Sequence, residues 1–150
     1  MKALSVKQPY AHEIALGLKK LELRTWKTAY RGDLLICASK YDPGLWVDVE
    51  LEGKTYPLPL PCGVQMCVVC VSDVRQMTRA DARESGIKYA PGMYAWVLTD
   101  PRPVLPAPVV GALNLFTVDE KFITKMPKGD SWLDYDYPNR RKTPPKAWAE

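Results

Sequence analysis

Proline and glycine set the strongest limit on how this chain can fold. The sequence holds 14 prolines and nine glycines, and they stand between short apolar runs. Proline lacks a backbone N–H and clashes inside a helix, so a chain interrupted this often does not form a helical bundle. Short apolar runs separated by turn residues are typical of strands joined by tight connections. We therefore predict an α+β fold that is mainly β, a closed or half-closed barrel of about six or seven strands with two or more short helices.

The size and charge of the chain fit a single domain. Domains cluster at about 100 to 150 residues, and this chain has 150. Its net charge of +4 is compatible with a polyanionic partner without requiring one. No run of about 18 apolar residues and no signal-peptide core is present, which predicts a cytoplasmic protein with no membrane partner. We expect a barrel domain over residues 1–125 and an irregular aromatic and basic tail over 126–150, packed on the barrel or flanking it.

The cysteines do not indicate a metal site. Cys67 and Cys70 have a spacing that can indicate zinc or redox chemistry. Both fall within the apolar run 64–71, however, and residues three apart in a strand face opposite sides of the sheet. They therefore cannot bind one ion together, and we predict that all four cysteines are buried structural thiols. The sequence also lacks a phosphate-cradling glycine loop, so no cofactor is expected.

The first forty residues predict the order strand, helix, strand, strand. Apolar and polar residues alternate over 3–7. A helix should begin at Pro9 or the next residue, since proline is pre-organised for the first helical position, and end at Gly17, which accepts a left-handed conformation. Strands follow over 20–26 and 34–39. With His12 and Glu13 facing away, the residues expected on the buried side of the helix are Tyr10, Ala11, Ile14, Ala15 and Leu18.

The later elements are predicted from turn and capping signals. Thr78 followed by Asp81 is an N-cap signature, which indicates a helix from there to Gly86. Gly111 in an otherwise extended run indicates a bulge or a close backbone approach. The remaining predicted elements are a hairpin over 49–56, a buried strand over 64–74, a strand over 93–98, a short edge strand between the prolines of 100–108, and a last strand over 109–118.

The segment 17–26 is the most informative about function. In a strand, successive side chains point to opposite sides of the sheet. Leu21, Leu23 and Thr25 would therefore share one face, and the other would present Lys20, Glu22, Arg24 and Trp26. A solvated edge strand shows such a pattern, and so does one wall of a binding cleft.

Three motifs in this region resemble the ASCH domain family, which belongs to the PUA-like barrels. The first is Ser5-Val6-Lys7-Gln8-Pro9-Tyr10-Ala11, the second is Gly17-x-Lys19-x-x-Glu22-x-Arg24-x-Trp26, and the third is Tyr30-Arg31-Gly32-Asp33-Leu34-Leu35-Ile36. Later residues, among them Tyr94-Ala95-Trp96-Val97-Leu98, also resemble the family, so the resemblance spans roughly residues 3 to 118. It implies a PUA-like barrel with the short helices at its rim and a cleft beside the second motif.

The resemblance also implies a class of ligand. ASCH domains are thought to bind RNA or other nucleic acid in this cleft, so the expected partner is RNA, another single-stranded nucleic acid, a nucleobase or a modified nucleoside. Basic side chains would meet phosphates, and Tyr10, Trp26 or Trp96 would stack on an unpaired base. The cleft residues carried over by motif match are Gln8, Tyr10, Lys19, Glu22, Arg24, Trp26 and Arg31.

Whether the protein is an enzyme stays open. Some similar proteins are amidohydrolases that remove an acyl group from acetylated cytidine, with a threonine nucleophile where this chain has Glu22, and ribonuclease activity is associated with other members. In a hydrolase, Lys19 and Glu22 would form the acid/base pair. In a non-catalytic interaction domain, the charges of Glu22 and Arg24 would only stabilise the barrel rim. 

The tail contains aromatic residues that are expected to lie across the barrel, because large rings are rarely left in water. The basic run 140–146 is either a solvated tail or a phosphate-contacting arm.

Overall fold

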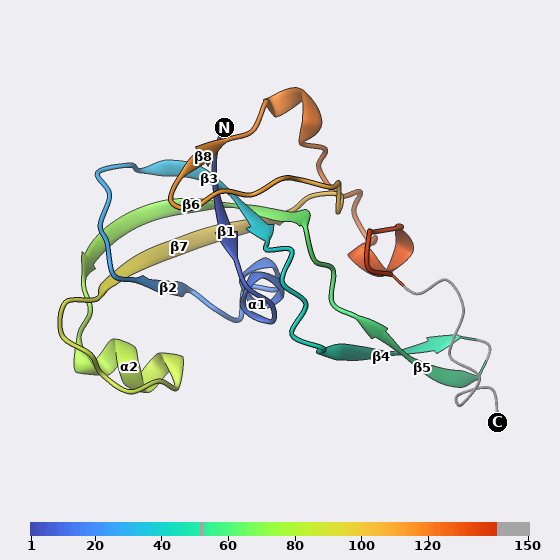
Figure 1. The fold of residues 1–150 in the computed structure, drawn as a ribbon, viewed down its shortest axis with the longest axis horizontal. Helices are drawn as coiled ribbons and strands as arrows, with labels where there is room; N and C mark the ends of the chain where they lie inside the picture. The colour runs from blue at the N-terminus through green and yellow to red at the C-terminus, as the bar shows by residue number, and fades with distance from the viewer. Residues whose placement is uncertain (52, 141–150) are drawn as a thin grey trace.

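A curled six-stranded sheet forms the body of the molecule, and a two-stranded hairpin stands beside it (Figure 1). The computed structural model describes residues 1–51 and 53–140. The order of strands in the sheet is β2-β7-β6-β3-β1-β8, so the mainly β half-barrel agrees with the prediction. The strands of this sheet are β1 (Lys2–Val6), β2 (Leu21–Arg24), β3 (Gly32–Ala38), β6 (Val64–Gln76), β7 (Tyr94–Pro103) and β8 (Phe116–Thr117).

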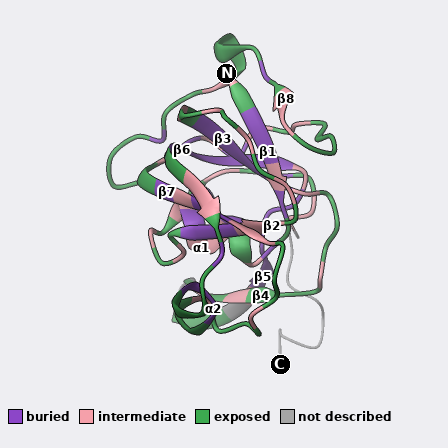
Figure 2. Cartoon of the chain, turned by 90° about the vertical axis from the view of Figure 1, so that its left-hand side faces the viewer, coloured by how far each residue is buried: buried purple, intermediate pink, exposed green. Residues whose placement is uncertain are grey.

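The N-terminal part has the predicted order of strand, helix, strand and strand. β1 and β3 pair in parallel, with Ala3 opposite Leu35, and both strands are largely buried (Figure 2). Helix α1 (Tyr10–Ala15) and β2 lie between them in the chain. Ala11 and Ile14 pack into the core, as predicted.

Three side chains in and just after α1 differ from the prediction: Tyr10 and Leu18 are exposed, and His12 is packed. Tyr10 is 49% exposed and Leu18 is 74% exposed. The helix has only six residues and Gly17 takes a φ of 77°, so the chain leaves the helical period before Leu18. His12, predicted to face away, instead packs edge-on against Trp132 with ring centroids 5.7 Å apart.

Helix α2 (Arg79–Ser85) begins and ends where the capping signals predict. The Thr78 hydroxyl accepts a hydrogen bond from the backbone N–H of Asp81, and the Asp81 carboxylate accepts one from the N–H of Thr78 at 2.8 Å. Arg75 donates to both carboxylate oxygens of Asp81 at 2.5 and 2.9 Å. Gly86 closes the helix with a φ of 68°.

The strands of the second half are longer and fewer than predicted. β6 reaches Gln76, and β7 runs on through the prolines to Pro103, so the short edge strand predicted between 100 and 108 is wrong. Proline fits here because the register between β6 and β7 shifts between Val68 and Cys70, which leaves Pro101 without a ladder partner. The strand predicted over 109–118 is also wrong, since only Phe116 and Thr117 pair, with β1.

The hairpin consists of β4 (Trp46–Leu51) and β5 (Lys54–Pro59), longer than the predicted 49–56. Glu52 at its tip lies outside the described residues. Among the helices of the described residues, none is long and apolar enough to cross a membrane.

The segment after β8 packs on the core through two aromatic residues. It includes two short 3-10 helices, η1 (Glu120–Phe122) and η2 (Trp132–Asp134). Trp132 and Tyr137 belong to the main buried cluster, and the Tyr137 hydroxyl donates to the carbonyl of Pro59 at 2.6 Å. Of the basic run 140–146, all residues but Arg140 lie outside the described residues.

Three of the four cysteines are buried free thiols, whereas Cys70 is partly exposed.

Candidate nucleic-acid interface

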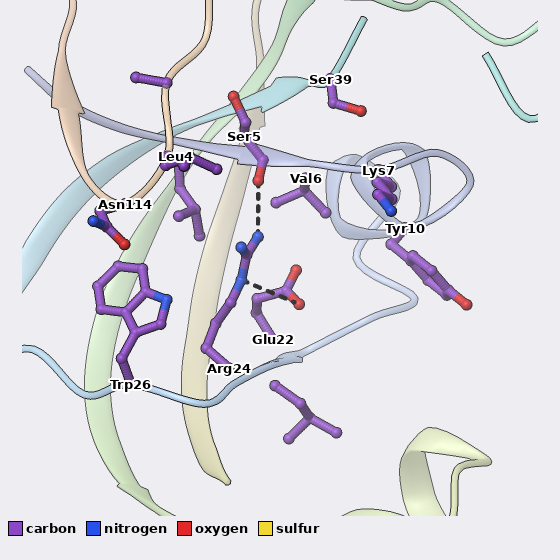
Figure 3. A pocket seen from close by; sticks show the side chains of 13 residues that line it. Leu4, Ser5, Val6, Lys7, Tyr10, Glu22, Arg24, Trp26, Ser39 and Asn114 are labelled. Atoms are coloured by element: carbon purple, nitrogen blue, oxygen red, sulfur yellow. Dashed lines mark hydrogen bonds and ion pairs between the residues drawn. The ribbon is translucent and has the colours of Figure 1, made fainter. Parts of the chain in front are cut away.

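The sheet is open between β2 and β1, and a cleft of about 520 Å³ lies at this opening (Figure 3). β2 forms one edge of the sheet, and the curl of the sheet brings that edge toward β1. Residues 4–7 line one side of the cleft, and residues 22–24 with Trp26 line the other. Tyr10, Ser39 and the loop residues 112–114 complete the lining.

Pairing with β7 determines which side chains of β2 face the cleft. Glu22 is opposite Trp96 and Arg24 is opposite Tyr94 in the antiparallel ladder. Because side chains alternate along a strand, Glu22 and Arg24 share one side, as the sequence pattern predicts. Arg24 then bridges the open edge, since its Nη2 donates to the carbonyl of Ser5 in β1 at 2.8 Å.

Several polar atoms at the cleft have unused hydrogen-bonding capacity. Arg24 Nε lies 3.8 Å from Glu22 Oε1, an ion pair too long for a hydrogen bond. Within the described residues, Glu22 Oε2, Arg24 Nε and Ser39 Oγ are buried and have no hydrogen-bond partner. Buried polar groups nearly always find partners, so these atoms are available to a ligand or to water.

Glu22 is a buried ionisable group of the cleft. It is only 8% exposed. Burial raises the pKa of its carboxyl, and the positive charges of Arg24 and Lys19 offset part of that rise. The carboxyl therefore holds a proton at a higher pH than an ordinary glutamate.

Trp26 offers an aromatic surface to the cleft, and Trp96 supports it from behind. The two rings meet edge to face with centroids 4.8 Å apart, and Trp96 Nε1 donates to the carbonyl of Trp26 at 3.3 Å. Trp96 is completely buried, so it cannot stack on a ligand. Of the three rings that the sequence suggested for stacking, Trp26 and Tyr10 line the cleft.

The structure brings four of the seven sequence-predicted site residues to the cleft: Tyr10, Glu22, Arg24 and Trp26. Lys19 stands beside it, with its Nζ 5.4 Å from the centroid of the Tyr10 ring. Gln8 is buried and lies outside the cleft lining. Its Nε2 donates to the carbonyl of Pro61 at 2.8 Å, and its Oε1 accepts from the N–H of His12 at 3.0 Å. Arg31 is also outside the lining, and its Nη2 lies 3.7 Å from Asp73 Oδ1.

The sequence-based site missed Lys7, Ser39 and the loop 112–114. Lys7 lies in the first ASCH-like motif but was not predicted as a site residue. No local sequence pattern indicates that Ser39 belongs to the cleft. For the loop the only signal is Gly111. A Cβ on Gly111 would collide with Ser5 Oγ, so the close backbone approach predicted at this glycine is confirmed.

Gly111→Ala is expected to lower the free energy of unfolding by about 1 to 3 kcal/mol, because the added methyl overpacks the contact with β1. Chemical denaturation measures the change. Since the collision is with the Ser5 hydroxyl, adding Ser5→Ala to the same chain should restore most of the lost stability. A double variant as unstable as Gly111→Ala would contradict this explanation.

Comparison with known proteins identifies the family and supports the fold. The sequence model of the ASCH domain family matches residues 4–108. This chain belongs to the ASCH domain family. A crystal structure of a mutant ASCH protein from Zymomonas mobilis is similar in fold, with a TM-score of 0.52, 12% sequence identity, and coverage of 80% of this chain and 91% of that one. No curated protein matches the chain.

Proposed function

We propose that this ASCH domain binds an unpaired base of RNA or of another single-stranded nucleic acid in the cleft between β1 and β2. The observation that supports this most directly is the presence of an aromatic face, Trp26, beside buried polar atoms of Glu22 and Arg24 that have no partner in the described structure. Family membership points to the same ligand class, nucleic acid in general.

The size and chemistry of the cleft suit a nucleobase. Pockets for small ligands measure about 300 to 1,000 Å³, and this cleft holds about 520 Å³. A base stacked on Trp26 would place its edge near groups of both polarities, since a carboxylate accepts from base N–H groups and a guanidinium donates to base carbonyls. The open side leaves room for the backbone, and Lys7 at the lining would meet a phosphate there.

The proposal is tested by titrating labelled single-stranded RNA and the matching duplex at increasing salt. We expect binding to the single strand, with log K falling by about 0.7 for each phosphate contact per tenfold rise in salt. Lys7→Gln should reduce that slope, whereas Lys88→Gln, on an exposed lysine outside the cleft lining, should leave it unchanged. Affinity independent of salt, or preference for the duplex, would contradict the proposal.

A hydrolase is the second candidate, and the buried position of Glu22 favours it. A carboxyl whose pKa is raised by burial is suited to general acid/base chemistry. Lys19 would be its partner, because its charge acts on Glu22. Product analysis after incubation with acetylated cytidine and with RNA separates the candidates: turnover that Glu22→Gln stops identifies a hydrolase, whereas binding without turnover identifies a binding module.

A further inference from the structure

The loop 109–115 crosses β1 at the cleft and is fixed at both ends. At one end Pro108 bridges to Val64, and the N–H of Val109 donates to the carbonyl of Gly63 at 3.0 Å. At the other end Phe116 pairs with Ala3. Between them Gly111 rests against Ser5. The loop is thus held against the strand whose Ser5 carbonyl receives Arg24.

Two large apolar side chains of this loop are left in water. Val110 and Leu113 are each 92% exposed. Only Leu113 belongs to the lining of the cleft. An exposed leucine is ordinary by itself. Leu113, however, belongs to a loop that is fixed at both ends, and it lines the same cleft as Trp26. A ring bound in the cleft would cover it.

Asn114, the next residue, adds a polar group at the same end of the cleft as Trp26 (Figure 3). Its φ of 61° is in the left-handed region, which asparagine enters more readily than most residues. Leu113 and Asn114 therefore present an aliphatic side chain and an amide to the same space.

We infer that Leu113 is a ligand-contacting residue that covers the base stacked on Trp26, with Asn114 beside it as a hydrogen-bonding group for the base edge. This inference rests on the proposed function and deepens it, because it assigns the loop 112–114 to the recognition of the base. The ligand class is a planar heterocycle with an aromatic face for Trp26, an apolar contact for Leu113 and polar edge atoms for Glu22, Arg24 and Asn114.

The test uses a labelled single-stranded RNA pentamer of mixed sequence and measures its dissociation constant by fluorescence anisotropy. Leu113→Ser should weaken binding by about fivefold, because an apolar contact with the base is lost. Val110→Ser is the matched control, since Val110 is equally exposed on the same loop but outside the lining. It should bind within about twofold of the wild type, and Leu113→Met should keep the wild-type affinity.

Denaturation midpoints of all three variants should equal that of the wild type, because both positions are exposed. Equal loss of binding in Leu113→Ser and Val110→Ser, or loss in neither, would overturn the inference. If Trp26→Ala weakens binding and Leu113→Ser does not, the proposed function stands and this inference fails. If the wild-type protein does not bind the RNA, the proposed function fails and the inference fails with it.

Discussion

Replacing Trp26 by alanine is expected to weaken binding of single-stranded RNA by about tenfold to a hundredfold. Stacking of one base on an aromatic side chain contributes about 1 to 3 kcal/mol, and Trp26 lines the cleft. The affinity is measured by titration at one fixed salt concentration, since the phosphate contacts are unaffected by this change. Trp26→Phe keeps a ring at the same place and should lose much less.

The matched control for this variant is Trp46→Ala. Trp46 lies on β4, is 37% exposed, and does not line the cleft. Its replacement should leave RNA affinity within about twofold of the wild type. A loss as large as that of Trp26→Ala would contradict the assignment of the binding site. Trp26→Ala keeps the hydrogen bond from Trp96 Nε1 to the backbone carbonyl at position 26 but loses the ring contact with Trp96, so its denaturation midpoint is measured beside the affinity.

Replacing Glu22 by glutamine is expected to change how stability depends on pH. Burial raises the pKa of Glu22 above its ordinary value of 4.5. Between these two pKa values the folded chain holds a proton that the unfolded chain has released, so the free energy of unfolding of the wild type falls as the pH rises through the interval. One such group gives a slope of at most about 1.4 kcal/mol per pH unit. Glutamine does not ionise, so the variant should lack this fall.

Urea denaturation of both proteins at a series of pH values measures the difference. The stability of Glu22→Gln relative to the wild type should rise as the pH increases above 4.5 and level off above the folded-state pKa. A difference that is constant with pH would show that Glu22 titrates normally in the folded state.

Asp81→Asn provides a control of opposite sign. The hydrogen bonds from Arg75 hold the pKa of Asp81 well below its ordinary value of 3.8. The ionised Asp81 therefore stabilises the fold above pH 3.8, and this stabilisation is lost as the pH falls through the lowered pKa. Asp81→Asn should cost about 2 kcal/mol at neutral pH, from the lost ion pair with Arg75, and less in acid.

Features encoded by adjacent residues were predictable from the sequence. Helix α2 follows from the reciprocal hydrogen bonds of Thr78 and Asp81, which need only a three-residue spacing. The shared side of Glu22 and Arg24 follows from the period of a strand. The motifs placed Tyr10, Glu22, Arg24 and Trp26 in one cleft, and the structure brings them together.

Features that depend on distant pairing were not predictable from local patterns. Gln8 lies next to cleft residues in the chain, but it is buried and its amide donates to the carbonyl of Pro61, 53 positions away. The sequence 109–118 has the composition of a strand, yet only its end finds a partner in β1. Gly111 indicated a close approach, but no spacing in the sequence indicates that its partner is Ser5 or that residues 112–114 line the cleft.

Anchoring the first strand to the last one also has a consequence for biosynthesis. The N-terminal amine of Met1 donates to the carbonyl of Val118 at 2.8 Å, across a separation of 117 positions. Loop closure over such a distance makes folding slow compared with local structure. On the ribosome, β2 can pair with β7 before residue 111 emerges. The wall of the cleft that residues 112–114 form cannot be in place at that stage. A nascent chain can therefore form part of its sheet before it completes the cleft, and ligand binding would report a late step of folding and not its onset.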